Sequence, residues 1–319
     1  MVSLYGWMAT SPPVLIHSHR CDGFEIHDIG HHLSANRTIR FVTSMWHYYA
    51  ETIAMMYDAY HLFRPDDAIF HLVNDASICE QLVSHGYPAH FVSSNAFLDE
   101  RLFVVSRPVS HNFDAVYNAR MSRFKRHQLA ARIPRLMILG GMVSPDDTQE
   151  YFQEVQNAIP HATFVHANDN RHRSALEVSE LLNQARVGLC LSACEGAMFA
   201  ATEYLLCGLP VVSTVSKGGR DAWFEPEFSR IVPDEPQAVA DAVAELIELK
   251  IPPEEVREAA LKRIWEHRRR FIDLGQLAYS AWNVGREFAR DFYTNFTHKM
   301  GEWRAPEDVM KYYDQARCR

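Results

Sequence analysis

The sequence lacks a long hydrophobic run. No stretch of its 319 residues approaches the roughly 20 consecutive apolar residues that a transmembrane helix needs. The first 13 residues also lack the basic start and the long apolar stretch of a secretory signal peptide. We therefore expect a cytoplasmic protein.

Basic residues are not in surplus, because 32 Lys and Arg face 40 Asp and Glu, a net charge of −8. This balance argues against a general nucleic-acid-binding protein. Positive charge gathers only locally, at residues 123–127 and 262–270. The second cluster has helical spacing and includes Trp265, so it predicts a solvated helix face. The alternative is a peripheral contact with the inner face of a membrane, or with a partner or second copy in an oligomer.

Disulfide and metal patterns are also missing. The six cysteines are scattered along the chain and predict free, mostly buried thiols of a reducing compartment. The 17 histidines form no H-E-x-x-H motif, and no D-x-D triplet occurs. The sequence predicts no structural metal and no required metal cofactor.

Short apolar runs alternate with longer helical patterns, which is typical of an α/β protein with parallel sheets. The chain is long enough for two domains with separate cores. A first set of strands is expected at residues 14–17, 39–44, 68–73 and 89–93. A second set is expected at residues 135–140, 162–167, 187–192, 210–214 and 229–232. Helices are expected between these strands, and almost the whole chain after residue 252 has a helical pattern.

We predict an N-terminal acceptor-side domain at residues 1–106 and a donor-binding domain at residues 107–285. Helices in residues 286–319 are expected to complete the first domain. In open parallel sheets, ligands bind beyond the carboxyl ends of the strands.

Two acids, Glu195 and Glu203, interrupt the otherwise apolar segment "SACEGAMFAATEYLLCGLPVV" after one expected strand. They either lie on a solvated edge or hold a ligand. If the whole interval is helical, the acids are separated by about 12 Å along the axis and by about 80° of rotation. This geometry suits the two ends of an extended ligand better than one reacting centre.

This segment resembles the E-x7-E signature of retaining GT-B glycosyltransferases, particularly family 4. Residues 92–103 resemble the segment that closes the first domain of that family, and Arg120 and Lys125 match its R-x4-K spacing. Residues 176–196 and the glycine loop at 211–219 follow in the same order. The resemblance covers roughly residues 36–245. It implies a GT-B fold of two Rossmann-like domains, here with an abbreviated N-terminal domain and a helical C-terminal tail.

The resemblance also implies roles for single residues. Glu195 would contact hydroxyls of the donor sugar, and Glu203 the ribose of the nucleotide. Arg120 and Lys125 would hold the pyrophosphate, because cations stabilise the charge that grows on a departing nucleoside diphosphate. The N–H groups of Gly196 and Ala197, as residues beside a helix N-terminus, are candidate phosphate donors.

A family histidine near the donor sugar corresponds most closely to His47, with His17 and His19 as competitors at the preceding strand end. The interval between residues 166 and 173 lacks the glycine usual in the base-recognition loop, so the base is not named.

The implied function is transfer of a sugar from a nucleoside diphosphate-sugar donor to an acceptor hydroxyl, with retention of configuration. No cofactor is expected besides this donor substrate. The acceptor is expected to be a growing glycan, a lipid-linked sugar or a small glycoside. Two alternatives stay open: a non-catalytic nucleotide-sugar or glycan-binding protein with a degenerate GT-B fold, and a GT-B epimerase or phosphorylase.

Overall fold

The structure is a computed structural model. It describes residues 3–18, 37–44, 46–106, 111–142, 147–165, 171, 173–301, 303–304 and 311. The chain divides into two compact units. Unit 1 contains Met1–Asp99 and Ile264–Arg319, and unit 2 contains Glu100–Arg263. The chain therefore passes from unit 1 to unit 2 after Asp99 and returns to unit 1 at Ile264. Both positions come earlier in the chain than the predicted domain boundaries at residues 106 and 285. The assignment of the units to acceptor and donor remains a prediction.

Unit 1 is built on a six-stranded sheet of order β12-β1-β2-β3-β4-β5. Four strands run parallel, and these are the strands that the sequence predicted: β2 (Pro13–Ser18), β3 (Ile39–Thr43), β4 (Ala68–Val73) and β5 (Ala89–Phe91). The edge strand β12 (Trp303–Arg304) and its neighbour β1 (Ser3–Thr10) add antiparallel pairings that were not predicted. A hairpin strand such as β1 has no helix after it to mark a strand-helix unit.

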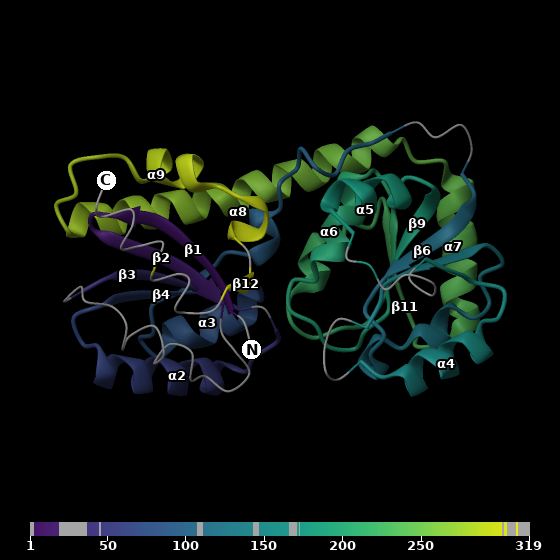
Figure 1. The fold of residues 1–319 in the computed structure, drawn as a ribbon, viewed down its shortest axis with the longest axis horizontal. Coiled ribbons are helices and arrows are strands. Elements are labelled where there is room, and N and C mark those ends of the chain that lie inside the picture. The colour runs from purple at the N-terminus through teal and green to yellow at the C-terminus, as the bar shows by residue number, and fades with distance from the viewer. Residues whose placement is uncertain are drawn as a thin grey trace. The chain divides into compact units, whose positions relative to one another are not determined.

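Helices cover both faces of this sheet (Figure 1). α2 (Ala50–Phe63) and α3 (Ala76–Ser84) lie on one face, and α9 (Phe288–Asn295) and the C-terminal part of α8 (Pro253–Ala281) lie on the other.

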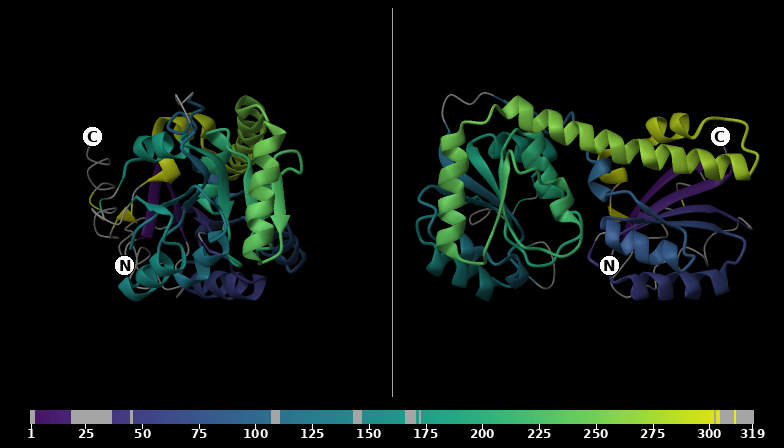
Figure 2. Two further views of the ribbon diagram at one scale, coloured as in Figure 1. Left: turned by 90° about the vertical axis from the view of Figure 1, so that its right-hand side faces the viewer. Right: turned by 180° about the vertical axis from the view of Figure 1, so that it is seen from behind.

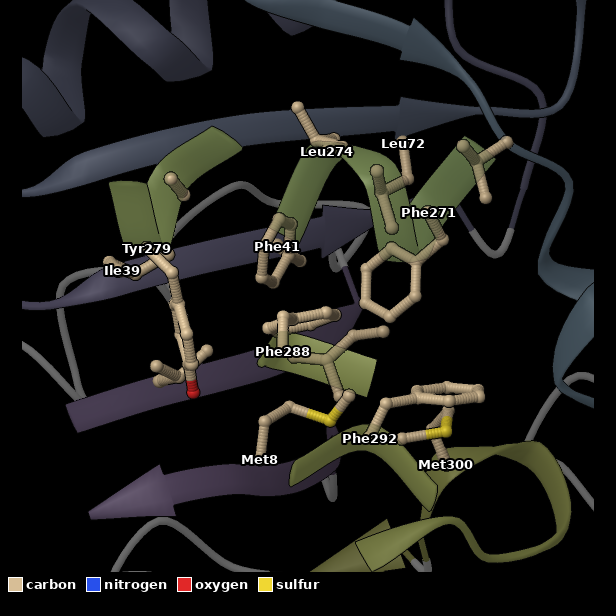
Figure 3. Packing of buried hydrophobic residues seen from close by; sticks show 14 of the residues in the cluster. Met8, Ile39, Phe41, Leu72, Phe271, Leu274, Tyr279, Phe288, Phe292 and Met300 are labelled. Atoms are coloured by element: carbon tan, nitrogen blue, oxygen red, sulfur yellow. The ribbon is translucent and has the colours of Figure 1, made fainter. Parts of the chain in front are cut away.

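Aromatic rings fill the space under α8 and α9 (Figure 3). The ring centroid of Phe41 lies 4.9 Å from that of Phe271 and 5.7 Å from that of Phe288. A Cβ at Gly275 would lie 2.2 Å from the Phe288 ring, so glycine allows this close packing. The C-terminal helices thus supply part of the core of unit 1.

Unit 2 is an all-parallel sheet of order β11-β10-β9-β6-β7-β8. Its strands are β6 (Phe113–Asn118), β7 (Leu136–Leu139), β8 (Thr163–Phe164), β9 (Ala185–Cys190), β10 (Val211–Thr214) and β11 (Ser229–Val232). This is the doubly wound order in which the chain direction along the sheet reverses between β6 and β9. The sequence prediction omitted β6, whose apolar centre is flanked by the polar residues Asp114 and Asn118.

The helices of unit 2 are α4 (Gln149–Ala158), α5 (Ala175–Leu182), α6 (Phe199–Leu206) and α7 (Pro236–Leu249). α6 and α7 lie on opposite faces of the sheet, as both Figure 1 and the rear view in Figure 2 show. α6 packs closely on β9, because a Cβ at Gly188 would lie 2.3 Å from the Tyr204 ring. The GT-B prediction of two Rossmann-like units and a helical C-terminal region is confirmed.

The described cysteines are free thiols, as predicted: Cys79, Cys190, Cys194 and Cys207. Burial raises the pKa of the Cys190 thiol to about 12, which makes it an inert core residue. Within the described part of the chain, no helix is long and apolar enough to span a membrane.

Acid should destabilise unit 2 through His127. Burial lowers the pKa of this ring from 6.5 to about 4, against the opposing effect of a backbone hydrogen bond at Ala119. The unfolded chain takes up this proton near pH 6.5 and the folded chain does not. The stabilising contribution is therefore complete above pH 6.5 and is lost as the pH falls toward 4.

Between pH 7 and pH 4, the free energy of unfolding of the wild type should fall by on the order of 3 kcal/mol more than that of His127→Gln. Urea titrations at several pH values measure this difference. His85→Gln, which replaces an exposed histidine, should follow the wild type. Parallel curves for the wild type and His127→Gln would contradict the prediction.

Candidate active site

The candidate site lies in unit 2, at the carboxyl ends of β6, β9 and β10. The chain leaves these strands at Asn118, Cys190 and Thr214, and the loops that follow contain most of the predicted residues. β6 and β9 are neighbours in the sheet although a long stretch of chain separates them. Their loops therefore diverge in opposite directions at the switch point, which is where open α/β sheets bind ligands.

Lys125 and Glu195 form a buried ion pair at this point. The Lys125 Nζ contacts Glu195 Oε1, and the side chains are only 11% and 7% exposed. The Ser192 hydroxyl donates a hydrogen bond of 2.7 Å to the same carboxylate oxygen. Both contacts involve Oε1, and no described residue donates a hydrogen bond to Oε2. The second oxygen is therefore available to a ligand.

Arg120 and Lys125 come together around one aromatic ring. The Arg120 Cζ lies 5.1 Å from the centroid of Phe124, and the Lys125 Nζ lies 4.9 Å from it. Arg120 also lies 3.6 Å from the buried carboxylate of Asp147, while its own side chain stays 27% exposed. The two predicted cations thus share a location, with Arg120 the more accessible of the two.

Glu195 is not on a helix, contrary to the sequence interpretation. α6 begins at Phe199, and its N-cap residue Met198 has a left-handed backbone (φ 51°) and makes no side-chain capping hydrogen bond. The separation expected for two acids on one helix therefore does not apply. Glu195 lies in the preceding loop, where its N–H donates to the Lys217 carbonyl (2.9 Å).

Glu203 lies within α6 and is only 4% exposed. Its Oε2 accepts a hydrogen bond of 3.3 Å from the side-chain amide of Asn118. The next residue, Tyr204, accepts a hydrogen bond of 2.6 Å from the Asn118 N–H. Asn118 therefore ties α6 to the end of β6. Sequence reasoning missed it because β6 itself was missed.

The two residues after Glu195 are buried in the same loop, with Ala197 only 3% exposed. Within the described part of the chain, the Gly196 N–H makes no hydrogen bond. Its proposed role as a phosphate donor is consistent with this, and it remains a prediction for both residues.

The histidine candidates belong to unit 1. His47 lies between β3 and α2, half-buried, with its ring centroid 5.1 Å from that of Tyr49. His17 lies inside β2 and is 2% exposed, and burial lowers its pKa to about 3. A neutral core histidine is a poor candidate for a ligand contact. His19 lies outside the described residues, and the role of His47 stays a prediction.

Arg126, named by neither motif, braces the site from behind. Its Nε donates to the Leu191 carbonyl (2.7 Å), and its Nη2 donates to the Thr214 hydroxyl (2.6 Å). Its Nη1 contacts Asp234 at 2.6 Å. The side chain therefore joins the ends of β9 and β10 and is not free to bind phosphate. Among the described residues, no group of three or more His, Cys, Asp or Glu side chains could hold a metal ion.

Comparison with known proteins agrees with this geometry. The model of the family described as "Glycosyl transferases group 1" matches residues 102–249, which contain the whole site. This region belongs to the group 1 glycosyltransferases. The predicted enzyme class, a retaining glycosyltransferase that uses a nucleoside diphosphate-sugar donor, is thereby confirmed at the level of the family.

Solved structures of low sequence identity share the GT-B fold. Sucrose-phosphate synthase from Thermosynechococcus elongatus is 17% identical, with a TM-score of 0.61 over 85% of this chain and 74% of that one. HepE from Anabaena, in complex with UDP and glucose, is 15% identical, with a TM-score of 0.56 over 78% and 80%. The pneumococcal O-GlcNAc transferase GtfA, in complex with UDP and GlcNAc, is 16% identical, with a TM-score of 0.52 over 74% and 52%. No curated protein matches this chain at the level of sequence.

Breaking the buried pair should destabilise unit 2. Lys125→Met leaves the Glu195 carboxylate buried without its ammonium partner, which should lower the free energy of unfolding by about 2–4 kcal/mol. Lys125→Met/Glu195→Gln should recover part of that loss. Arg123→Met, which breaks the exposed Arg123–Glu154 pair, is the matched control and should have a much smaller effect. Urea unfolding of the wild type and these three variants measures the losses, and equal losses for Lys125→Met and Arg123→Met would count against a buried pair.

Proposed function

We propose that this group 1 glycosyltransferase binds a UDP-sugar at the switch point of unit 2, with Glu195 holding the sugar and with Arg120 and Lys125 holding the diphosphate. The observation that carries the proposal is the Lys125–Glu195 ion pair, which brings the sugar-binding acid and a diphosphate-binding cation of the family pattern into contact. The R-x4-K and E-x7-E motifs are far apart in the sequence, and a chance match of either one would not be expected to bring their side chains into contact.

The charge distribution supports this orientation. The diphosphate is the leaving group, so negative charge grows on it as the bond to the sugar breaks. Arg120 supplies a planar guanidinium that is suited to two phosphate oxygens, and Lys125 supplies a point charge. The N-terminus of α6 adds the positive end of a helix dipole. The retaining step is drawn for the family as attack on the same face, assisted by the leaving group.

Donor binding would then be an exchange of partners. Without donor, the Lys125 ammonium is neutralised by Glu195. A diphosphate competes for that ammonium, and each displaced contact frees Glu195 Oε1 to accept hydrogen bonds from sugar hydroxyls. The diphosphate and the sugar of the donor therefore replace one internal ion pair with two intermolecular contacts.

Glu203 is proposed to hold the ribose, a role that its burial next to Asn118 supports by fixing the carboxylate in one place. UDP is proposed as the nucleotide because HepE and GtfA are both solved in complex with UDP. The acceptor is proposed to be a carbohydrate or lipid-linked hydroxyl bound by unit 1, and His47 is proposed to contact the donor sugar.

A cytoplasmic location is proposed as well. Free thiols at Cys79 and Cys194, which are only half-buried, suit a reducing compartment. For the basic cluster on α8, residues 262–270, the proposal remains a solvated helix face or a peripheral contact with a membrane or a partner. Trp265 is 56% exposed there, while Ile264 and Phe271 are buried.

Nucleotide binding tests the donor assignment. The wild type should bind UDP more tightly than GDP or ADP in isothermal titration calorimetry. Lys125→Ala should weaken UDP binding about ten-fold or more, because a charge-assisted contact of at least about 1.4 kcal/mol is lost. Lys262→Ala, which removes an exposed lysine of α8, is the control. Unchanged affinity in folded Lys125→Ala would remove Lys125 from the site.

Turnover tests the role of Glu195. Glu195→Gln keeps the shape of the side chain and removes its charge. It should reduce UDP release from the preferred UDP-sugar by roughly ten- to a hundred-fold. The affinity for UDP itself should not fall, since UDP lacks the sugar and no longer has to displace a Glu195 carboxylate from Lys125. Glu227→Gln, at an exposed position, should behave as wild type. Donor binding by the wild type without any turnover would support the alternative of a binding protein.

A further inference from the structure

Arg220 lies beneath the Glu195 loop with no exposed surface. It opens the short helix η4 (Arg220–Trp223) directly after two glycines with left-handed backbones, Gly218 (φ 109°) and Gly219 (φ 91°). Residues with a side chain rarely adopt such angles, so the glycines allow the turn that brings Arg220 back under the sheet edge. A fully buried guanidinium is costly unless its donors are satisfied.

All five N–H groups of Arg220 are accounted for. Nη1 donates to the carbonyl and to the hydroxyl of Ser192, both at 3.1 Å. Nη2 donates to the Ser213 hydroxyl and the Thr214 carbonyl, both at 2.8 Å. Nε faces the Asp221 carboxylate at 3.4 Å. A planar fork with five donors fits this set, and the three donors of a lysine at a single nitrogen do not.

The contact with the Ser192 hydroxyl has a directional consequence. A serine oxygen accepts hydrogen bonds through its lone pairs and donates through a single O–H. Because Arg220 occupies a lone pair of that oxygen, the hydroxyl hydrogen is directed to Glu195 Oε1, 2.7 Å away. A chain of donors thus runs from Arg220 through Ser192 to the acid.

We propose that Arg220 is a positioning residue for the transfer reaction: it orients Ser192, and through it holds the Glu195 carboxylate for the donor sugar. This inference rests on the proposed function, in which Glu195 contacts the sugar and Lys125 the diphosphate. Arg220 therefore affects recognition of the sugar and leaves recognition of the diphosphate almost unchanged.

Arg126 provides the internal comparison. It also joins the ends of β9 and β10, through the Leu191 carbonyl and the Thr214 hydroxyl, but none of its hydrogen bonds reaches Ser192. A purely structural brace would act as Arg126 does, on stability alone. Comparison of variants at Arg126 and Arg220 therefore distinguishes an effect on stability alone from an effect on sugar recognition.

The experiment measures sugar recognition as the ratio of two dissociation constants, that of UDP divided by that of a UDP-sugar. UDP-glucose and UDP-N-acetylglucosamine are the probes, and the one that binds the wild type more tightly is used in calorimetry. Arg220→Met, Arg220→Lys and Ser192→Ala should each lower the ratio, by about ten-fold for Arg220→Met. The double variant Ser192→Ala/Arg220→Met should lower it no further than Ser192→Ala alone, because Arg220 acts through the Ser192 hydroxyl. Arg126→Met should keep the wild-type ratio even where its stability falls.

The outcomes separate this inference from the proposed function. If neither probe binds the wild type more tightly than UDP, or Glu195→Gln keeps the wild-type ratio, the proposed role of Glu195 fails and this inference with it. If Glu195→Gln lowers the ratio while Arg220→Lys and Ser192→Ala keep it, this inference alone is overturned. An equal fall of the ratio in Arg126→Met would also overturn it, because bracing would then explain the effect. Should Arg220→Met not fold, Arg220→Lys and its double variant with Ser192→Ala give the same test.

Discussion

The contact between the Lys125 ammonium and the Glu195 carboxylate is the interaction on which the site depends. Neither charge could remain buried at the end of the sheet without the other. The two residues come from separate loops, and they meet because β6 and β9 are adjacent at the switch point of the sheet. Strand order, rather than closeness in sequence, therefore creates the site. The same adjacency brings Asn118 of β6 to Glu203 of α6.

Loops with such tasks need a rigid support, and two arginines supply it. Arg126 and Arg220 approach the ends of β9 and β10 and donate to carbonyl and hydroxyl groups there. Carbonyl groups at the end of a strand have no further ladder partner, so these hydrogen bonds satisfy them and also fix the direction in which each loop leaves the sheet. The guanidinium groups of Arg126 and Arg220 donate to several protein partners, whereas the Arg120 guanidinium lies beside one carboxylate, that of Asp147, among the described residues.

Apolar runs followed by helical patterns made most of the fold predictable, and β4 and β11 have the predicted bounds. The pattern failed where its physical basis is absent. The apolar centre of β6 spans only residues 115–117, between Asp114 and Asn118, and β1 belongs to a hairpin without a helix. The start of α6 was misplaced because the left-handed residue before it is Met198, a residue type that does not mark helix starts. The motif residues were found by spacing, but the Lys125–Glu195 contact and the buried Arg220 depend on coordinates that spacing does not contain.

The ion pair also bears on selectivity. Under the proposed roles, a free phosphate binds the Lys125 ammonium only by breaking its ion pair with Glu195. The phosphate has no hydroxyl group of a sugar to donate to the carboxylate left behind. A nucleoside diphosphate without sugar has the same deficit, partly offset by its contacts with Arg120 and the ribose site. Only a sugar nucleotide provides new contacts to both Lys125 and Glu195. Its diphosphate binds the ammonium, and its sugar hydroxyls donate to the carboxylate that the diphosphate has displaced. An incomplete ligand leaves the buried Glu195 carboxylate without a partner, which lowers the affinity for that ligand. The internal salt bridge, placed where the sugar joins the diphosphate, therefore favours binding of the intact donor.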